Sequence, residues 1–183
     1  MVPVEITRSD ASFLEDGVEF CYEDKGLCLD DLNNLFEAVG FPRREILRLQ
    51  TAMHHTHRVV WARSVKKSRF AHKGQCLGFA RATSDGALVA TIWDVAVHPT
   101  WMRCGIGRGL MERLAAGLQE DGIGTVALYA EPGVVNMYKK LGYEVPGDCR
   151  GMAFLRRAGT GARLRAEVQG ALKERGSGAA AGW

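Results

Sequence analysis

The alternation of apolar and polar residues divides the chain into short strands and helices of mixed order. Strands are predicted where the pattern alternates or stays apolar, over residues 18–22, 59–62, 76–82, 88–97, 126–130 and 151–155. Helices are predicted over residues 29–36, 42–53 and 134–141, and over the stretch from the glycine-rich residues 105–109 to Gly122. This order of elements predicts a mixed α/β fold.

The strand over residues 88–97 is long and apolar enough to lie inside a sheet. The turn residues Ser84, Asp85 and Gly86 separate it from the strand over 76–82, so these two strands should form an antiparallel hairpin.

The pattern also predicts how the chain is organised. Residues 1–15 have no clear period and no transit-peptide character, so they are interpreted as a loose arm. The folded domain is expected over residues 16–157. Residues 158–183 are expected to be an appendage, with Leu164, Val168 and Leu172 on one helical stripe and a disordered end from Gly176.

Composition fits a single domain with one core: of 183 residues, 46% are apolar and 25% charged. Charged residues interrupt every hydrophobic stretch, so no membrane association is expected. The five cysteines include no C-x-x-C pair, which predicts small core residues in a reducing compartment. The histidines at 54, 55 and 57 make a metal site conceivable, but no Cys, Asp or Glu follows them closely, and none is predicted.

Charge is unevenly distributed along the chain. The net charge of +3 is too small to indicate nucleic-acid binding. The first 31 residues contain nine acids and two bases, whereas eight basic residues and no acid lie between Glu45 and Asp85. The basic stretch is interpreted as a solvated loop, with an anion-attracting patch as the alternative.

Closely spaced glycines between a strand and a helix are typical of an anion-binding turn. Gly105, Gly107 and Gly109 precede the predicted helix, where backbone N–H groups and the helix dipole favour negative charge. No G-x-x-x-x-G-K-[ST] is present, which excludes a P-loop. A dinucleotide fingerprint fails because Leu110 stands where its third glycine is needed.

Two ordered segments resemble a known family. Val95-Ala96-Val97-His98-Pro99, followed by residues 104–110 (CGIGRGL), closely resembles the cofactor motif of the GNAT (Gcn5-related) N-acetyltransferases. Residues 134–143 (VVNMYKKLGY) resemble that family's A-I-x-L-Y-x-K-L-G-F segment. The resemblance covers roughly residues 77–154. It implies a mixed, mostly antiparallel sheet that is splayed at its centre, with helices on both faces.

The sequence departs from the family pattern at two positions. Met102 stands where the family prefers Gln or Arg, which should weaken phosphate binding without abolishing it. Gly109 stands where alanine is commoner, and it is expected only to loosen the start of the helix.

The resemblance also implies residue roles toward acetyl-coenzyme A. The backbone of Val95, Ala96 and Val97 would hydrogen-bond the pantetheine arm, and Tyr138 would protonate the departing thiolate. The remaining coenzyme contacts are expected from Arg103, Cys104, Gly105, Ile106, Gly107, Arg108, Glu131, Gly133 and Asn136. The alternative for residues 95–97 is a plain core strand, that for residues 103–108 is a surface turn, and that for Tyr138 is a buried structural tyrosine.

The base that deprotonates the acceptor is assigned to Asp94, a carboxylate in an otherwise apolar strand. A structural hydrogen bond is the alternative role for Asp94, and Glu131 and His98 are alternative bases. Cys104 could have a lowered pKa among the phosphate-binding amides, but no nearby base supports an acyl-cysteine route.

The expected activity is direct transfer of acetyl from acetyl-coenzyme A to a primary amine. Residues 128–132 and 151–154 look most like plant plastid members, described as serotonin N-acetyltransferases or as acetyltransferases of protein lysines and N-termini. A plastid location is therefore suspected. The acceptor stays open, and the acidic first segment could attract any of these amines. A non-catalytic acyl-coenzyme A-binding regulator and an oxidoreductase are the alternatives.

Overall fold

The computed structural model describes residues 4–145, which form one five-stranded sheet with helices on both faces. The strands are β1 (Val18–Cys21), β2 (Arg58–Ser64), β3 (Cys76–Ser84), β4 (Val89–Val97) and β5 (Thr125–Leu128). The helices are α1 (Asp10–Glu15), α2 (Leu29–Ala38), α3 (Ile46–His54), α4 (Ile106–Glu120) and α5 (Val135–Lys139), with short 3-10 helices at Pro99–Trp101 and Pro132–Val134.

The strands lie in sequence order, β1-β2-β3-β4-β5. The first four pair antiparallel, and β5 pairs parallel to β4. This arrangement confirms the predicted mixed, mostly antiparallel sheet and the β3–β4 hairpin.

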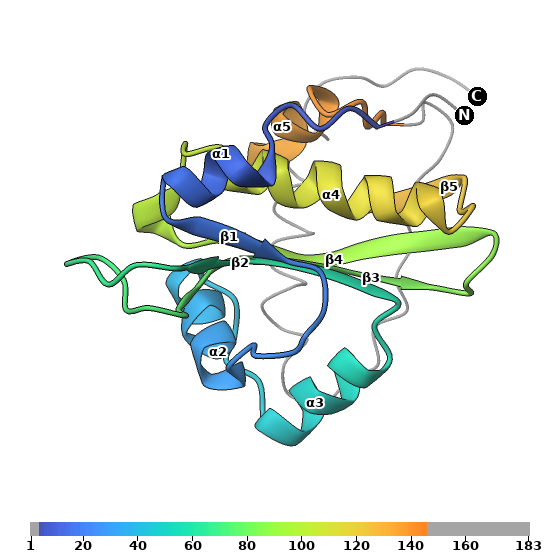
Figure 1. Ribbon diagram of the computed structural model, residues 1–183. Helices are drawn as coiled ribbons and strands as arrows, with labels where there is room; N and C mark the ends of the chain where they lie inside the picture. The colour runs from blue at the N-terminus through green and yellow to red at the C-terminus, as the bar shows by residue number, and fades with distance from the viewer. Residues whose placement is uncertain (1–3, 146–183) are drawn as a thin grey trace, which may run out of the picture. The chain divides into compact units, whose positions relative to one another are not determined.

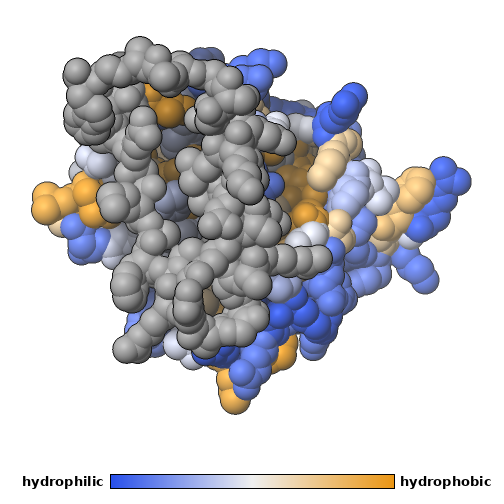
Figure 2. Space-filling model, turned by 180° about the vertical axis from the view of Figure 1, so that it is seen from behind, coloured by the Kyte–Doolittle hydropathy of each residue, from blue (hydrophilic) through white to orange (hydrophobic). Residues whose placement is uncertain are grey.

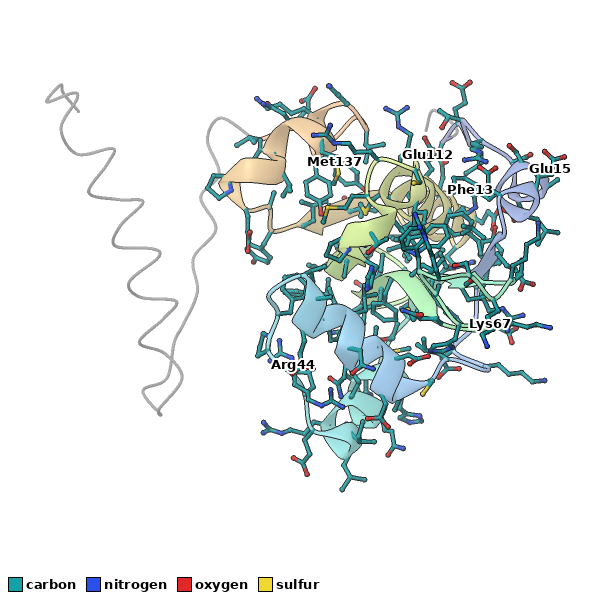
Figure 3. The ribbon with its side chains drawn as sticks, turned by 90° about the vertical axis from the view of Figure 1, so that its left-hand side faces the viewer. Phe13, Glu15, Arg44, Lys67, Glu112 and Met137 are labelled. Carbon is teal, nitrogen blue, oxygen red and sulfur yellow. The ribbon has the colours of Figure 1, made fainter. Side chains whose placement is uncertain are left out.

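Each face of the sheet has its own hydrophobic core. Helices α1, α4 and α5 lie on one side of the sheet, and α2 and α3 lie on the other (Figure 1). The α4 side buries Leu110, Leu114 and Leu118 completely. The α2 side is centred on Trp61 and Phe79, which are also fully buried. Figure 3 shows Glu112 of α4 on one side of the sheet and Arg44 on the other.

The N-terminal arm is not loose over residues 4–15. Its helix α1 begins at an N-cap where Ser9 accepts the Ser12 N–H, and Phe13 is 1% exposed. Thr7 donates its hydroxyl to Glu112 at 2.8 Å, and Figure 3 shows Phe13 on the same side as α4. The sequence prediction was wrong because the groups that order this segment lie about 100 residues later.

Two other predictions need correction. Helix α3 begins at Ile46, whereas the sequence predicted that this helix begins at Pro42. Residues 41–45 have non-helical backbone, and the last of them, Glu45, is the N-cap. The strand predicted over residues 126–130 is β5, which spans Thr125–Leu128 and whose residues alternate between exposed and half-buried positions. The half-buried residues, Val126 and Leu128, pack against the core on the α4 side.

The cysteine and histidine predictions have mixed outcomes. Among the four described cysteines, only Cys76 is buried, whereas Cys21 is half-buried and Cys28 and Cys104 are exposed. Within residues 4–145, no group of three or more His, Cys, Asp or Glu side chains could hold a metal ion. His57 contacts Asp121 Oδ2 at 2.9 Å instead.

Some predictions lie outside the described residues: the strand over 151–155, the end of the domain at 157, the appendage over 158–183, and Cys149. Among residues 4–145, no helix is both long and apolar enough to cross a membrane.

Candidate active site

Strands β4 and β5 pair along only part of the length of β4. They pair only from Val89 with Thr125 to Ile92 with Leu128, although β4 continues to Val97. No described strand pairs with this edge of β4 beyond Ile92. The His98 N–H donates to the Leu77 carbonyl, so His98 and Ala96 present their backbone groups to β3. The backbone groups of Val95 and Val97 are therefore open on the other side, as the predicted pantetheine contact requires.

A β-bulge causes this separation. The β3–β4 register shifts between Phe79, which pairs with Ala96, and Arg81, which pairs with Trp93. Two residues of β4 thus lie opposite one residue of β3, and Asp94 has a φ of 54° in the left-handed region. A bulge bends its strand and increases the local twist, so the end of β4 turns away from β5.

The strained Asp94 backbone is held by an ion pair. Arg81 Nε donates to Asp94 Oδ2 at 2.6 Å, and Arg81 Nη1 also donates to Thr56 Oγ1 at 3.4 Å. This contact gives Asp94 the structural hydrogen bond that was the alternative to a role as base. His98 is occupied as well, since its Nδ1 accepts the Thr100 N–H at 3.3 Å.

The turn before α4 presents unpaired amides. The N-cap Gly105 has a φ of 84°, and Arg103 has a φ of 62°. Within residues 4–145, no backbone N–H from positions 103–108 donates to another group. These N–H groups lie at the positive end of a 15-residue helix, so the turn is suited to a bound anion.

The N-terminal segment packs behind this turn. A Cβ on Gly109 would lie 2.8 Å from Phe20 Cζ and 3.3 Å from Phe13 Cζ. Arg113, which is 5% exposed, donates its Nη1 to the Gly109 carbonyl at 3.2 Å and its Nε to Asp10 at 2.7 Å. Gly109 therefore does more than loosen the helix start, because a larger residue would force Phe20, Arg113 or Phe13 to move.

One cavity of about 620 Å³ joins these features. Ten of the fourteen predicted site residues line it: Asp94, Val95, Ala96, Val97, Arg103, Gly105, Gly107, Arg108, Glu131 and Tyr138. The other four, Cys104, Ile106, Gly133 and Asn136, are not part of its lining, and Ile106 belongs to the core. No described residue of the acidic first segment lines the cavity, so any attraction of amines by that segment would act from outside the lining.

Tyr138 reaches the cavity from α5. The residue is 8% exposed, and its ring lies 6.0 Å from that of Tyr143 in an edge-to-face contact. Burial raises the pKa of the Tyr138 phenol, and the negative charge of Glu131 raises it further. The phenol is therefore protonated throughout the neutral range, as a proton donor must be.

Nine further residues line the cavity and were not predicted: Val39, Phe41, Ile92, Trp93, Met102, Leu128, Tyr129, Val134 and Met137. Several remain exposed, including Trp93 at 37% and Tyr129 at 69%. Figure 2 shows hydrophobic surface open beside hydrophilic surface on the face behind Figure 1. Met102, Val134 and Met137 lie in or beside the family motifs, but no local signal marks them as lining residues, since the separation of two strands brings this set together.

A protein-family model matches the part of the chain that contains this site. The family model described as "Acetyltransferase (GNAT) family" matches residues 29–143. The chain belongs to the GNAT acetyltransferase family. The match includes the bulged strand β4, the amide turn, helix α4 and Tyr138.

Curated plant proteins are similar to this GNAT acetyltransferase. GCN5-related N-acetyltransferase 1, chloroplastic, from Arabidopsis thaliana is 40% identical over 156 residues, which cover 85% of this chain and 76% of that protein. Serotonin N-acetyltransferase 2, chloroplastic, from Oryza sativa is 46% identical, covering 72% of this chain and 64% of that protein. Histone acetyltransferase TAP1 from Glycine max is 39% identical, covering 67% and 54%.

Solved structures share the fold. A GNAT family acetyltransferase from Streptococcus pneumoniae is 26% identical, with a TM-score of 0.60, and the match covers 77% of this chain and 99% of that one. An aminoglycoside acetyltransferase from a soil metagenomic sample is 18% identical, with a TM-score of 0.60 and coverages of 79% and 99%. At that identity the likeness is one of fold alone.

Proposed function

We propose that this GNAT acetyltransferase transfers acetyl from acetyl-coenzyme A directly to a primary amine. The observation that carries the proposal is a single cavity lined by three features: the open edge of β4, the amide turn before α4, and the phenol of Tyr138. In such a reaction the turn would bind the pyrophosphate, the edge of β4 would bind the pantetheine arm, and the phenol would protonate the thiolate. One bound coenzyme must therefore reach all three features.

The coenzyme is assigned to the α4 end of the cavity. Its pyrophosphate would be held by the backbone N–H groups of positions 103–108, with Arg103 and Arg108 adding positive charge. Its pantetheine arm would pair with the free edge of β4 at Val95 and Val97. In this arrangement the backbone supplies most of the donors, so Met102 should weaken phosphate binding without abolishing it.

The transfer needs one acid and one base. The neutral amine attacks the thioester carbonyl, a C–N bond forms, and the C–S bond breaks as the thiolate leaves. Tyr138 would donate its proton to that thiolate, because its raised pKa keeps the phenol protonated. The attacking nitrogen releases a proton as the amide forms, and that proton restores the phenol directly or through solvent. An alkylammonium has a pKa near 10.4, so it must lose a proton before it can attack.

We assign removal of that proton to Asp94, with Glu131 as the alternative. Arg81 donates to Asp94 Oδ2, and no hydrogen bond to Oδ1 is found among residues 4–145. Arg81 would then orient the carboxylate of Asp94, which lines the cavity. Glu131 also lines the cavity, and within the described chain it makes no ion pair.

The similar plant proteins bear on the acceptor and the location. Their names include a serotonin N-acetyltransferase and a histone acetyltransferase, so both a small amine and a protein amine are candidates. The Arabidopsis and rice relatives are named as chloroplastic, which supports a plastid location for this chain.

The test measures free thiol released from acetyl-coenzyme A in the presence and absence of a primary amine. Amine-dependent release is expected, and Tyr138→Phe should lower kcat about 10²- to 10⁴-fold while retaining the dissociation constant for coenzyme A. Tyr143→Phe is the matched control, since Tyr143 packs on the Tyr138 ring but does not line the cavity. Coenzyme binding without amine-dependent release would refute the proposal and favour a non-catalytic acyl-coenzyme A-binding protein.

A further inference from the structure

Two aromatic rings stack where β4 and β5 separate. Trp93 and Tyr129 follow directly after Ile92 and Leu128, the last paired residues of the two strands. Their ring centroids lie 5.6 Å apart, and their planes differ by 30°. Both rings line the cavity, and both stay partly exposed, at 37% and 69%. The pair therefore forms an open aromatic shelf, which we call the Trp93–Tyr129 shelf.

The shelf lies on the side of the sheet opposite α4. Ile92 and Leu128 pack into the core beneath α4, and successive side chains of a strand point to opposite faces. Trp93 and Tyr129 therefore point toward the side that carries α2 and α3. Hence the cavity has two different ends, with the amide turn at one and the shelf at the other.

The chemistry of the shelf favours stacking over hydrogen bonding. Trp93 Nε1 donates to Thr83 Oγ1 at 2.8 Å, so the indole N–H is already used and the ring is held in place. Val39 and Phe41 extend the lining with apolar surface from the end of α2. Large apolar side chains left open to water are typical of a surface that binds an apolar partner.

The charges near the shelf suit a cationic ligand. Among residues 4–145, two carboxylates line the cavity, and the only lysine or arginine side chains of its lining, Arg103 and Arg108, belong to the amide turn. Asp94 is paired with Arg81, whereas Glu131 has no ion-pair partner within residues 4–145. A ligand with an ammonium group and a flat ring would meet both conditions.

On these grounds, and resting on the activity proposed above, we infer that the Trp93–Tyr129 shelf binds the aromatic ring of the acceptor. The acceptor class is then the arylalkylamines, in which a short alkyl chain carries the primary amine away from the ring. The shelf holds the ring by stacking, which leaves the amine free to reach the thioester.

The test compares two amines with the same carbon skeleton. 2-Phenylethylamine and 2-cyclohexylethylamine carry the same ammonium group on the same chain, but only the first has a flat π ring. At saturating acetyl-coenzyme A, wild-type kcat/KM should be about 3- to 10-fold higher for the aromatic amine, the range that one aromatic contact supplies. Tryptamine and an N-terminally blocked lysine peptide extend the series.

Variants of the shelf test whether the Trp93–Tyr129 shelf causes the preference for the aromatic amine. Tyr129→Leu and Trp93→Leu should each bring the aromatic-to-cyclohexyl ratio of kcat/KM close to one, without raising KM for acetyl-coenzyme A. Tyr129 is the safer site, because its exposed ring contributes little to the core. Phe70→Leu is the matched control: Phe70 is 51% exposed, lies outside the cavity lining, and should leave the ratio unchanged.

The outcomes separate this inference from the proposed function. A wild-type ratio near one, or a ratio that Tyr129→Leu leaves unchanged, would overturn the inference while the acetyltransferase activity stands. Preferred turnover of the lysine peptide would overturn it too. If no amine releases thiol, the proposed function itself fails.

Discussion

Gly109→Ala tests how the N-terminal segment supports the amide turn. An added Cβ would lie 2.8 Å from Phe20 Cζ, 3.1 Å from Arg113 Nη1 and 3.3 Å from Phe13 Cζ. Cβ atoms in folded proteins do not come as close to a neighbour as 2.8 Å, so something must move. The Phe13 and Phe20 rings cannot shift freely, because both are buried and pack edge to face with centroids 4.9 Å apart.

Two opposing terms set the magnitude. Replacing glycine by alanine in a helix stabilises it by about 1 kcal/mol, whereas overpacking a core costs about 1 to 3 kcal/mol. The expected net loss is about 1 kcal/mol, with a range from about 0 to 2. For a domain of this size such a loss lowers Tm by about 2 to 4 °C.

Gly107→Ala provides the matched comparison in the same turn of α4. Its nearest neighbour would be Val97 Cγ2 at 3.4 Å, an ordinary contact, so stability should stay the same or rise. Gly107 lines the cavity, however, so its new methyl group should raise KM for acetyl-coenzyme A. Gly109→Ala, which faces the core, should lower Tm with less effect on that KM.

Thermal unfolding followed by circular dichroism measures the first effect, and initial rates at varied acetyl-coenzyme A measure the second. A Gly109→Ala protein about 1 kcal/mol more stable than the wild type would refute the packing argument, since the aromatic rings would then accept the methyl group at no cost and only the helix propensity of alanine would remain. Equal changes in KM for the two variants would refute the division of this turn into a core side and a ligand side.

Further predictions concern protonation and charge. If Asp94 is the base, Asp94→Asn should lower kcat/KM far more than Arg81→Gln does, and the residual rate of Asp94→Asn should rise with pH. Equal losses of kcat/KM in the two variants would show that Asp94 has a structural role only. Because the Tyr138 pKa is raised, loss of the phenol proton should not lower kcat at any pH below about 10. A fall in kcat below that pH that is present in the wild type and absent in Tyr138→Phe would contradict the assigned environment. Arg58 and His57 lower the pKa of Asp121 to about 2, so its contribution to stability is present above pH 3.8 and is lost toward pH 2. Urea unfolding at pH 6 and pH 2 should therefore show a smaller pH dependence for Asp121→Asn, although a surface pair of this kind contributes only about 0.2 to 1 kcal/mol.

The sequence predicted the elements that carry their own local signal. Strand β4, the hairpin before it and helix α4 follow from apolar periodicity and turn residues, which act over a few positions. Helix α1 was missed because one buried residue, Phe13, sets no period in six residues. Its stability comes from Glu112 and Arg113, about 100 positions away.

Part of the candidate site could also be predicted from the sequence. Tyr138 and the glycines of the amide turn stand in short motifs whose spacing is visible in the chain itself. The Asp94–Arg81 pair was not visible, because an alternating pattern does not reveal a bulge or the residue opposite it. Trp93 looked like any aromatic residue of an inner strand, and Tyr129 like the end of another.

The sequence by itself determined the order of strands and helices, the glycines that leave amides free, and the tyrosine available as an acid. Only the tertiary structure decided that β4 and β5 part after Ile92 and Leu128, and that one cavity crosses the sheet there. The reason is physical: periodicity reports which side of an element is buried, whereas a cavity depends on where two elements stop touching. That point is set by a bulge, an ion pair and the packing of helices from both faces, none of which belongs to a single stretch of chain.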